Sequence, residues 1–283
     1  MKKHLSTIFL VLALLVGAAL LLYPTASDYW NSFHQSRAIA TYAEEVASLT
    51  TADYEKMWLA AVDYNNRMGV AGNPFLLSEE QRADYLSQLD LSGNGIMGYI
   101  EIPKIECSLP IYHGTSEAVL QIAVGHIEGS SLPVGGPSTH CVLSGHRGLP
   151  SAKLFTHLDQ LGEGDVFMLR VLNETLTYEV DQIHIVLPQE VDDLAIVPGR
   201  DFCTLITCTP YGINSHRLLV RGKRIENSEA ATAIRVTSDA IRIDPILVAP
   251  VAAVPILLIL TIYLIANPGG KKKKKKKAKK PTT

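Results

Sequence analysis

The chain has 283 residues, of which 47% are hydrophobic and 19% charged, with 20 glycines and 15 prolines. This composition excludes an intrinsically disordered chain, a collagen-like chain and a small disulfide-dense protein, and the length allows at most two domains. The net charge of −2 hides an acidic centre, because positions 4 to 270 carry 28 acidic against 15 basic side chains, a net charge of −13. Such a centre repels phosphate and argues against a partner that is nucleic acid.

The N-terminal end carries two lysines and then an uncharged stretch of 18 residues, Leu5–Leu22. At about 1.5 Å per residue, this stretch is long enough to cross the hydrocarbon core of a bilayer as a helix. Pro24 would occupy the −3 position of a cleavage site, which disfavours removal of the stretch as a signal peptide. We therefore expect residues 1–23 to remain as a membrane anchor.

Residues 24–94 have a helical pattern. Apolar residues recur at steps of three and four between Ile39 and Val62, and residues 69–74 interrupt the pattern with two glycines and a proline. Ser78 and Gln81 have the spacing of a capping box, which predicts the start of a further helix. The sequence thus predicts a helical extension ahead of the main domain.

From residue 95 to 226 the pattern changes to short strands separated by turn residues. The absence of strand–helix–strand alternation predicts a mainly β domain, either a closed barrel or a sandwich, with a core large enough to need no disulfides. Asn173-Glu174 is expected to supply a hairpin turn, and residues 227–244 a linker. The predicted strands are Ile96–Ile102, Leu109–Tyr112, His140–Leu143, Val166–Val171, Thr175–Val186, Phe202–Thr207 and Leu218–Ile225.

A second apolar stretch, Pro245–Ala266, lies ahead of a lysine-rich tail at residues 267–283. A buried core helix is the alternative interpretation, but the lysines directly after the stretch favour a second membrane helix. Lysine-rich segments stay on the cytoplasmic side, so the sequence predicts a two-pass protein of the cell membrane whose central domain lies on the extracellular face. The tail would then contact anionic membrane lipid.

The cysteines lack the spacing of a structural zinc site, and no acidic cluster has the spacing of a calcium loop, so we expect neither a metal nor a cofactor. Cys208 ends an apolar strand and is followed by Pro210 and Gly212, which places its sulfur at the rim of the domain. The four cysteines are Cys107, Cys141, Cys203 and Cys208.

Two further side chains occupy similar strand ends, His146 after Ser144-Gly145 and Arg217 at the start of the last strand. A cysteine nucleophile needs a nearby base or a lowered thiol pKa, and an oxyanion needs fixed donors, which these residue types provide. On spacing alone, a packed cysteine and a histidine that hydrogen-bonds to the backbone are equally compatible with the pattern. The residues by themselves leave both interpretations open.

The combination of Thr204–Cys208, Arg217 nine residues later and Ser144–His146 upstream resembles the signature of the sortases, surface transpeptidases with a β-barrel fold. The block Cys208–Gly222 resembles the pilus-building class C sortases in particular. A helical N-terminal extension and a second membrane segment also fit that class. The resemblance covers residues 96–225 and implies a closed sortase-type barrel with a transmembrane helix at each end of the chain.

The resemblance also implies a role for each of the three residues, with Cys208 as nucleophile, His146 as general acid and Arg217 as the residue that positions substrate and steadies the oxyanion. The implied reaction cleaves an LPxTG-like sorting signal, forms a thioester and transfers the acyl group to a lysine amine of a pilin subunit. A sortase that anchors surface proteins to peptidoglycan amines would share these residues. A non-catalytic surface module would not depend on Cys208.

Class C sortases carry a lid with an Asp-Pro-aromatic motif, and the matching stretch here is Asn73-Pro74-Phe75. The neutral amide of Asn73 removes the charge pair that an aspartate would form with Arg217, so we expect a more mobile lid. An ordinary turn between helices is the alternative interpretation.

Cys141 precedes His146 by five residues, as Cys203 precedes Cys208. If the two strands run parallel side by side, as the resemblance suggests, Cys141 and Cys203 lie next to each other. Disulfide geometry is usually strained across neighbouring strands, so we expect two packed thiols.

Overall fold

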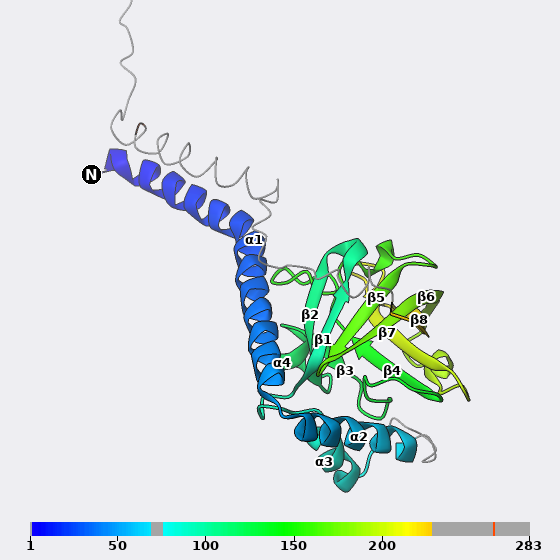
Figure 1. The fold of residues 1–283 in the computed structure, drawn as a ribbon. Coiled ribbons are helices and arrows are strands. Elements are labelled where there is room, and N and C mark those ends of the chain that lie inside the picture. Colours follow the sequence, from blue (N-terminus) through cyan, green and yellow to red (C-terminus); the bar gives the residue numbers. More distant parts are fainter. Residues whose placement is uncertain (1, 69–75, 228–262, 264–283) are drawn as a thin grey trace, which may run out of the picture. The chain divides into compact units, whose positions relative to one another are not determined.

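The computed structural model describes residues 2–68, 76–227 and 263, and Figure 1 shows their arrangement. Within this part of the chain, three longer helices come before the strands, as the sequence predicts, and a short helix, α4 (Glu117–Leu120), lies among the strands. The residues from Ala26 to Asn227 belong to one compact unit and those before Ala26 to another.

Helix α1 (Lys2–Ser48) contains the apolar N-terminal stretch and continues through Pro24 as one helix. By length and composition it can cross a membrane, because a window within Ile8–Ser48 has a mean hydropathy of 2.4 and none of that window is buried. The predicted apolar helix at the N-terminal end is therefore confirmed, and its length and composition are those of a membrane anchor.

Two shorter helices follow, α2 (Thr51–Met68) and α3 (Glu79–Ser87). The predicted capping box at the start of α3 is present, since Ser78 Oγ accepts a hydrogen bond from the Gln81 backbone N–H and Gln81 Oε1 accepts one from the Ser78 N–H. These bonds satisfy N–H groups that the helix itself leaves without partners.

Four predicted segments lie outside the described residues, apart from Asn227 and Tyr263. They are the lid Asn73-Pro74-Phe75, the linker 227–244, the second membrane helix 245–266 and the lysine-rich tail 267–283.

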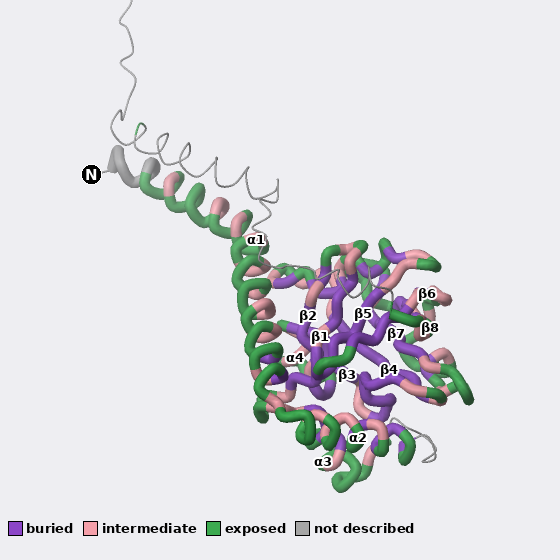
Figure 2. The backbone as a smooth tube through the Cα atoms, in the orientation of Figure 1, coloured by how far each residue is buried: buried purple, intermediate pink, exposed green. Residues whose placement is uncertain are grey.

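Eight strands close into a barrel in the order β1-β2-β3-β4-β7-β8-β6-β5. This closure decides between the two predicted architectures in favour of the barrel. Strands β2 and β3 pair in parallel, as do β4 and β7, and the other neighbours pair antiparallel. Figure 2 shows that the strands are mostly buried. The strands are β1 (Ile96–Ile102), β2 (Cys107–His113), β3 (Val124–His126), β4 (Thr139–Ser144), β5 (Val166–Val171), β6 (Glu174–Val186), β7 (Asp201–Thr209) and β8 (His216–Ile225).

The barrel differs from the sequence prediction at two places. Strand β3 was not predicted, because its three residues are too few to show an alternating pattern. The hairpin between β5 and β6 turns at Leu172-Asn173 rather than at Asn173-Glu174, since Glu174 already pairs with Val171. Leu172 adopts a left-handed backbone conformation, with a φ of 51°. Leucine is not a typical residue for this conformation, so the residue type does not predict the turn.

Tyr42 joins helix α1 to the barrel. Its ring is 2% exposed, and its hydroxyl donates a hydrogen bond to the Met97 carbonyl (3.1 Å) and accepts one from the Leu172 N–H (2.8 Å). Burial raises the pKa of this phenol well above its ordinary value, so the group stays neutral. The helical extension is thus held by buried hydrogen bonds to two different strand ends.

Replacing Tyr42 by phenylalanine should lower the free energy of unfolding of the full chain by about 1–3 kcal/mol, because the buried N–H of Leu172 loses its partner. Denaturant unfolding in detergent, followed by near-ultraviolet circular dichroism, measures the change. Tyr29→Phe serves as the matched control, since Tyr29 is 63% exposed. Equal stabilities of the two variants would contradict a structural role of the Tyr42 hydroxyl.

Candidate active site

The parallel pairing of β4 with β7 places His146 level with Cys208. Ser144 lies opposite Ile206 at the end of the ladder. The same offset continues beyond it, because the Gly145 N–H donates to the Ile206 carbonyl (3.0 Å) and the Thr207 hydroxyl donates to the Gly145 carbonyl (2.8 Å). One residue further along both strands are the imidazole and the thiol.

Arg217 lies on the other side of Cys208, as its direct cross-strand partner in the antiparallel pair of β7 and β8. Side chains opposite each other in such a pair have Cβ atoms about 5 Å apart. The guanidinium is positioned by its own loop, because Arg217 Nη1 donates to the carbonyls of Asn214 (3.2 Å) and His216 (3.1 Å). The structure therefore places Arg217 opposite Cys208 in the β7–β8 pair, and His146 in the loop after the neighbouring strand β4, two residues beyond its end.

The three side chains belong to the outer face of the barrel. Ile206 and Leu219, two residues from Cys208 and Arg217 respectively, lie opposite each other and pack with Val142 and Leu194 in a small buried cluster separate from the barrel core. Side chains two residues apart on a strand share a face, so Cys208 and Arg217 continue the face that this cluster occupies. Cys208 is partly exposed, and the side chain of His146 is 28% exposed.

Phe155, in the loop after β4, contacts both His146 and the residue before it. The Phe155 N–H donates to the His146 carbonyl (3.1 Å), and the Phe155 ring lies so close to Gly145 that a Cβ there would be 2.6 Å from it. Across the site, His146 Nε2 is 3.9 Å from a carboxylate oxygen of Glu117, at the start of α4 (Glu117–Leu120). Glycine is needed before the histidine because the aromatic ring fills the space of a side chain.

Sequence reasoning missed two residues beside the site, Glu117 and Tyr211. Tyr211, three residues after Cys208, lies against Gly148 and 6.0 Å from the Arg147 guanidinium, which also pairs with Asp159. The one signal in the sequence for the contact between Tyr211 and Arg147 is that Arg147 directly follows His146. Nothing in the spacing of Glu117 indicates its approach to the histidine.

The other three cysteines are buried free thiols. Cys141 lies directly opposite Cys203 in the β4–β7 pair, which confirms the predicted neighbourhood of two packed thiols. Burial raises the pKa of the Cys107 thiol to about 12 and that of Cys203 well above its usual range. Cys208 is thus the one cysteine with access to solvent.

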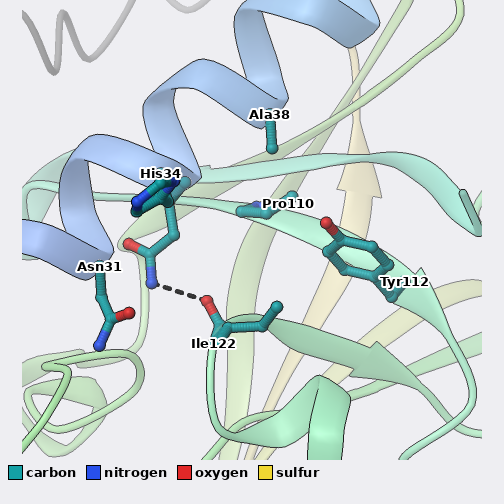
Figure 3. Close-up of a pocket in the computed structure, with 7 residues that line it drawn as sticks. Asn31, His34, Ala38, Pro110, Tyr112 and Ile122 are labelled. Atoms are coloured by element: carbon teal, nitrogen blue, oxygen red, sulfur yellow. Dashed lines mark hydrogen bonds between the residues drawn. The ribbon is translucent and has the colours of Figure 1, made fainter.

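A cavity of about 390 Å³ lies away from these residues, between α1 and β2 (Figure 3). Gln35 Nε2 donates to the Ile122 carbonyl across it (2.7 Å). Within the described part of the chain, no group of three or more histidine, cysteine or acidic side chains could hold a metal ion. The residues that line the cavity are Asn31, His34, Gln35, Ala38, Pro110, Tyr112 and Ile122.

Comparison with known proteins agrees with this geometry. The family model of the sortase domain matches residues 100–225. The chain is 54% identical to sortase C1 from Streptococcus agalactiae, with a TM-score of 0.67, over 68% of this chain and 100% of that chain. It is 43% identical to Clostridium perfringens sortase C, solved with the C-terminal cell wall sorting motif, with a TM-score of 0.59 over 68% of this chain and 99% of that one.

A more distant relative is sortase D of Bacillus subtilis, 32% identical over 131 residues, which are 45% of this chain and 63% of that protein. The alignment thus spans less than two thirds of that relative. A closed barrel with the partly exposed Cys208 near the end of one strand and Arg217 opposite it on the next is compatible with cysteine-dependent acyl transfer. The chain belongs to the sortase family, and it is a cysteine transpeptidase.

A small alkylating reagent at neutral pH should label native protein at Cys208 alone, because the other three thiols are buried and inaccessible to the reagent. Peptide mapping by mass spectrometry locates the label. The Cys208→Ala variant should take up none when folded, and both proteins should be labelled at the remaining cysteines after unfolding. Label on native Cys141 or Cys203 would contradict the packing described here.

Proposed function

We propose that the chain is a class C sortase that joins pilin subunits. Cys208 attacks the threonine carbonyl of an LPxTG-like sorting signal, and the bond to the glycine nitrogen breaks. His146 donates a proton to the leaving amine, and Arg217 positions the substrate and stabilises the oxyanion. The observation that carries this assignment is the placement of Cys208 opposite Arg217 and level with His146.

The second half of the proposed reaction transfers the acyl group to an amine. The thioester on Cys208 is attacked by a lysine side-chain amine of the next pilin subunit, which forms an isopeptide bond and restores the thiol. A thioester is activated toward amines, and exclusion of water from the site limits hydrolysis. Support for a pilin acceptor comes from the likeness to sortase C structures at 43–54% identity.

The proposed placement in the cell has the catalytic domain, residues 95–226, on the outer side of the membrane. Residues 1–23 anchor the chain, residues 24–94 form the helical extension, and residues 245–266 cross the membrane again after the linker 227–244. The lysine-rich tail then lies against anionic lipid on the inner face. The apolar helix α1 supports the first crossing.

The reaction can be tested on the full chain in detergent with sorting-signal peptides and a panel of amine acceptors, with the products identified by mass. We expect cleavage between threonine and glycine and transfer to a peptide containing a pilin lysine. Cys208→Ala should abolish both products, His146→Ala should lower turnover about 10²–10⁴-fold by loss of the general acid, and Arg217→Ala about 10²–10³-fold by loss of an oxyanion donor.

Preference for a peptidoglycan amine over the lysine peptide would replace the pilin assignment by cell-wall anchoring. Surface polymers that persist in cells carrying Cys208→Ala would contradict the proposed role of this thiol in joining pilin subunits. The Tyr29→Phe variant, altered at an exposed position of α1, is the matched control and should keep full turnover.

We also propose that Asn73-Pro74-Phe75 forms a lid over Cys208 that is held without a charge pair to Arg217. Restoring the acid with Asn73→Asp should slow both protease cleavage near residues 69–77 and alkylation of Cys208, by up to about fivefold for an ion pair of at most about 1 kcal/mol. Limited proteolysis and timed alkylation measure the two rates. A wild-type segment that resists protease while Cys208 stays unlabelled would contradict a mobile lid.

A further inference from the structure

The part of helix α1 after Ala26 has two contrasting faces. One face binds the barrel: Asn31 Nδ2 donates to the Ser151 carbonyl (2.8 Å), the Lys153 N–H donates to Asp28 Oδ1 (2.8 Å), and Tyr42 is buried. The other face carries three aromatic side chains that stay in solvent in the described structure. Tyr29 is 63% exposed, Trp30 64% and Phe33 54%.

The aromatic residues are confined to the turns of α1 nearest the apolar anchor. Further along the same face the exposed residues are Arg37, Ala40, Thr41 and Glu44, which are charged, polar or small, and none is aromatic. Figure 2 shows this side of the helix as exposed. Three neighbouring exposed aromatic rings form an apolar surface that water solvates poorly, and such surfaces mark contact sites. If exposed aromatic residues were favoured all along this face of α1, they would also occur in its later turns, and they do not.

The covalent connection to the anchor limits how far these rings can lie from the bilayer. Tyr29 lies seven residues after Leu22, the end of the apolar stretch, which corresponds to about 10 Å of helix. Helical side chains tilt toward the N-terminus, so the rings reach back toward the anchor. The interfacial layer of a bilayer adds about 5–8 Å on each side of the hydrocarbon core. Tyr29 and Trp30 are therefore within reach of this layer, and Phe33, one turn farther along, reaches it where the helix is tilted from the membrane normal.

We propose that Tyr29, Trp30 and Phe33 form an interfacial patch that inserts into the outer headgroup region of the same membrane that α1 crosses. Tyrosine and tryptophan are favoured at this depth because their rings are apolar at one end and polar at the other. The proposal concerns a lipid surface and is separate from the transpeptidase chemistry.

The patch lies on turns of α1 whose opposite face holds the loop that follows His146. Asp28 and Asn31 bind Lys153 and Ser151 in this loop. The turns that carry the patch are thus the same turns that hold this loop against the helix.

The chain contains two tryptophans, Trp30 and Trp58, which makes the proposal directly measurable. In Trp58→Phe the only tryptophan is Trp30. In the matched control, Trp30→Phe, it is Trp58, which stacks on Tyr54 with ring centroids 6.3 Å apart. Each full-length variant is reconstituted into phosphatidylcholine–phosphatidylglycerol vesicles that contain lipids brominated either near the glycerol end or near the tail end of the acyl chain. Bromine quenches tryptophan fluorescence only on close approach.

We expect Trp30 emission to shift to shorter wavelength than that of a water-exposed tryptophan, to be quenched more by bromine near the glycerol end than near the tail, and to be protected from aqueous iodide. Trp58 should not be quenched by either lipid. Trp30 that is quenched by iodide but not by brominated lipid would overturn the proposal. Protection from both quenchers would overturn it as well, because a second copy or another protein would then cover the patch.

Cleavage of a soluble sorting peptide by Trp58→Phe at the wild-type rate verifies that this variant is folded. Absence of cleavage by the wild-type chain would count against the proposed function while leaving the quenching result unaffected. The two proposals can therefore fail independently.

Discussion

The active site depends on the register between β4 and β7, two parallel strands that no short turn connects. Buried pairs on the inner face hold that register, with Cys141 opposite Cys203 and Leu143 opposite Leu205. A slip of one residue would turn each of these side chains to the other face, so packing of the core opposes it strongly. The barrel core therefore sets the distance between the imidazole and the thiol, although neither group belongs to the core.

The same register explains why cysteines of one strand differ so much in reactivity. Cys203 and Cys208 are five residues apart, an odd number, so an alternating strand directs them to opposite faces. Cys203 enters the barrel core and stays protonated, whereas Cys208 lies on the outer face at the strand end. Burial thus separates an inert thiol from a reactive one without any difference in residue type.

The sequence predicted most of the architecture because its signals are local. Alternating apolar residues identified the longer strands, and the capping box at Ser78 identified α3. Closure into a barrel depends on contacts between distant strands, and only the family resemblance indicated it. The three-residue strand β3 and the left-handed Leu172 carry no local signal. Glu117 approaches His146 solely through tertiary packing, so spacing could not reveal it.

Charge balance at Arg217 bears on the proposed chemistry at Cys208. Within the described residues, the hydrogen bonds of its guanidinium go to main-chain carbonyls, whereas Arg147 nearby pairs with a carboxylate, Asp159. A guanidinium without a carboxylate partner keeps its charge available for a thiolate or an oxyanion. In the proposed reaction, that charge can then act on the negative charge that develops at the substrate carbonyl held by Cys208, without first leaving a carboxylate partner among the described residues.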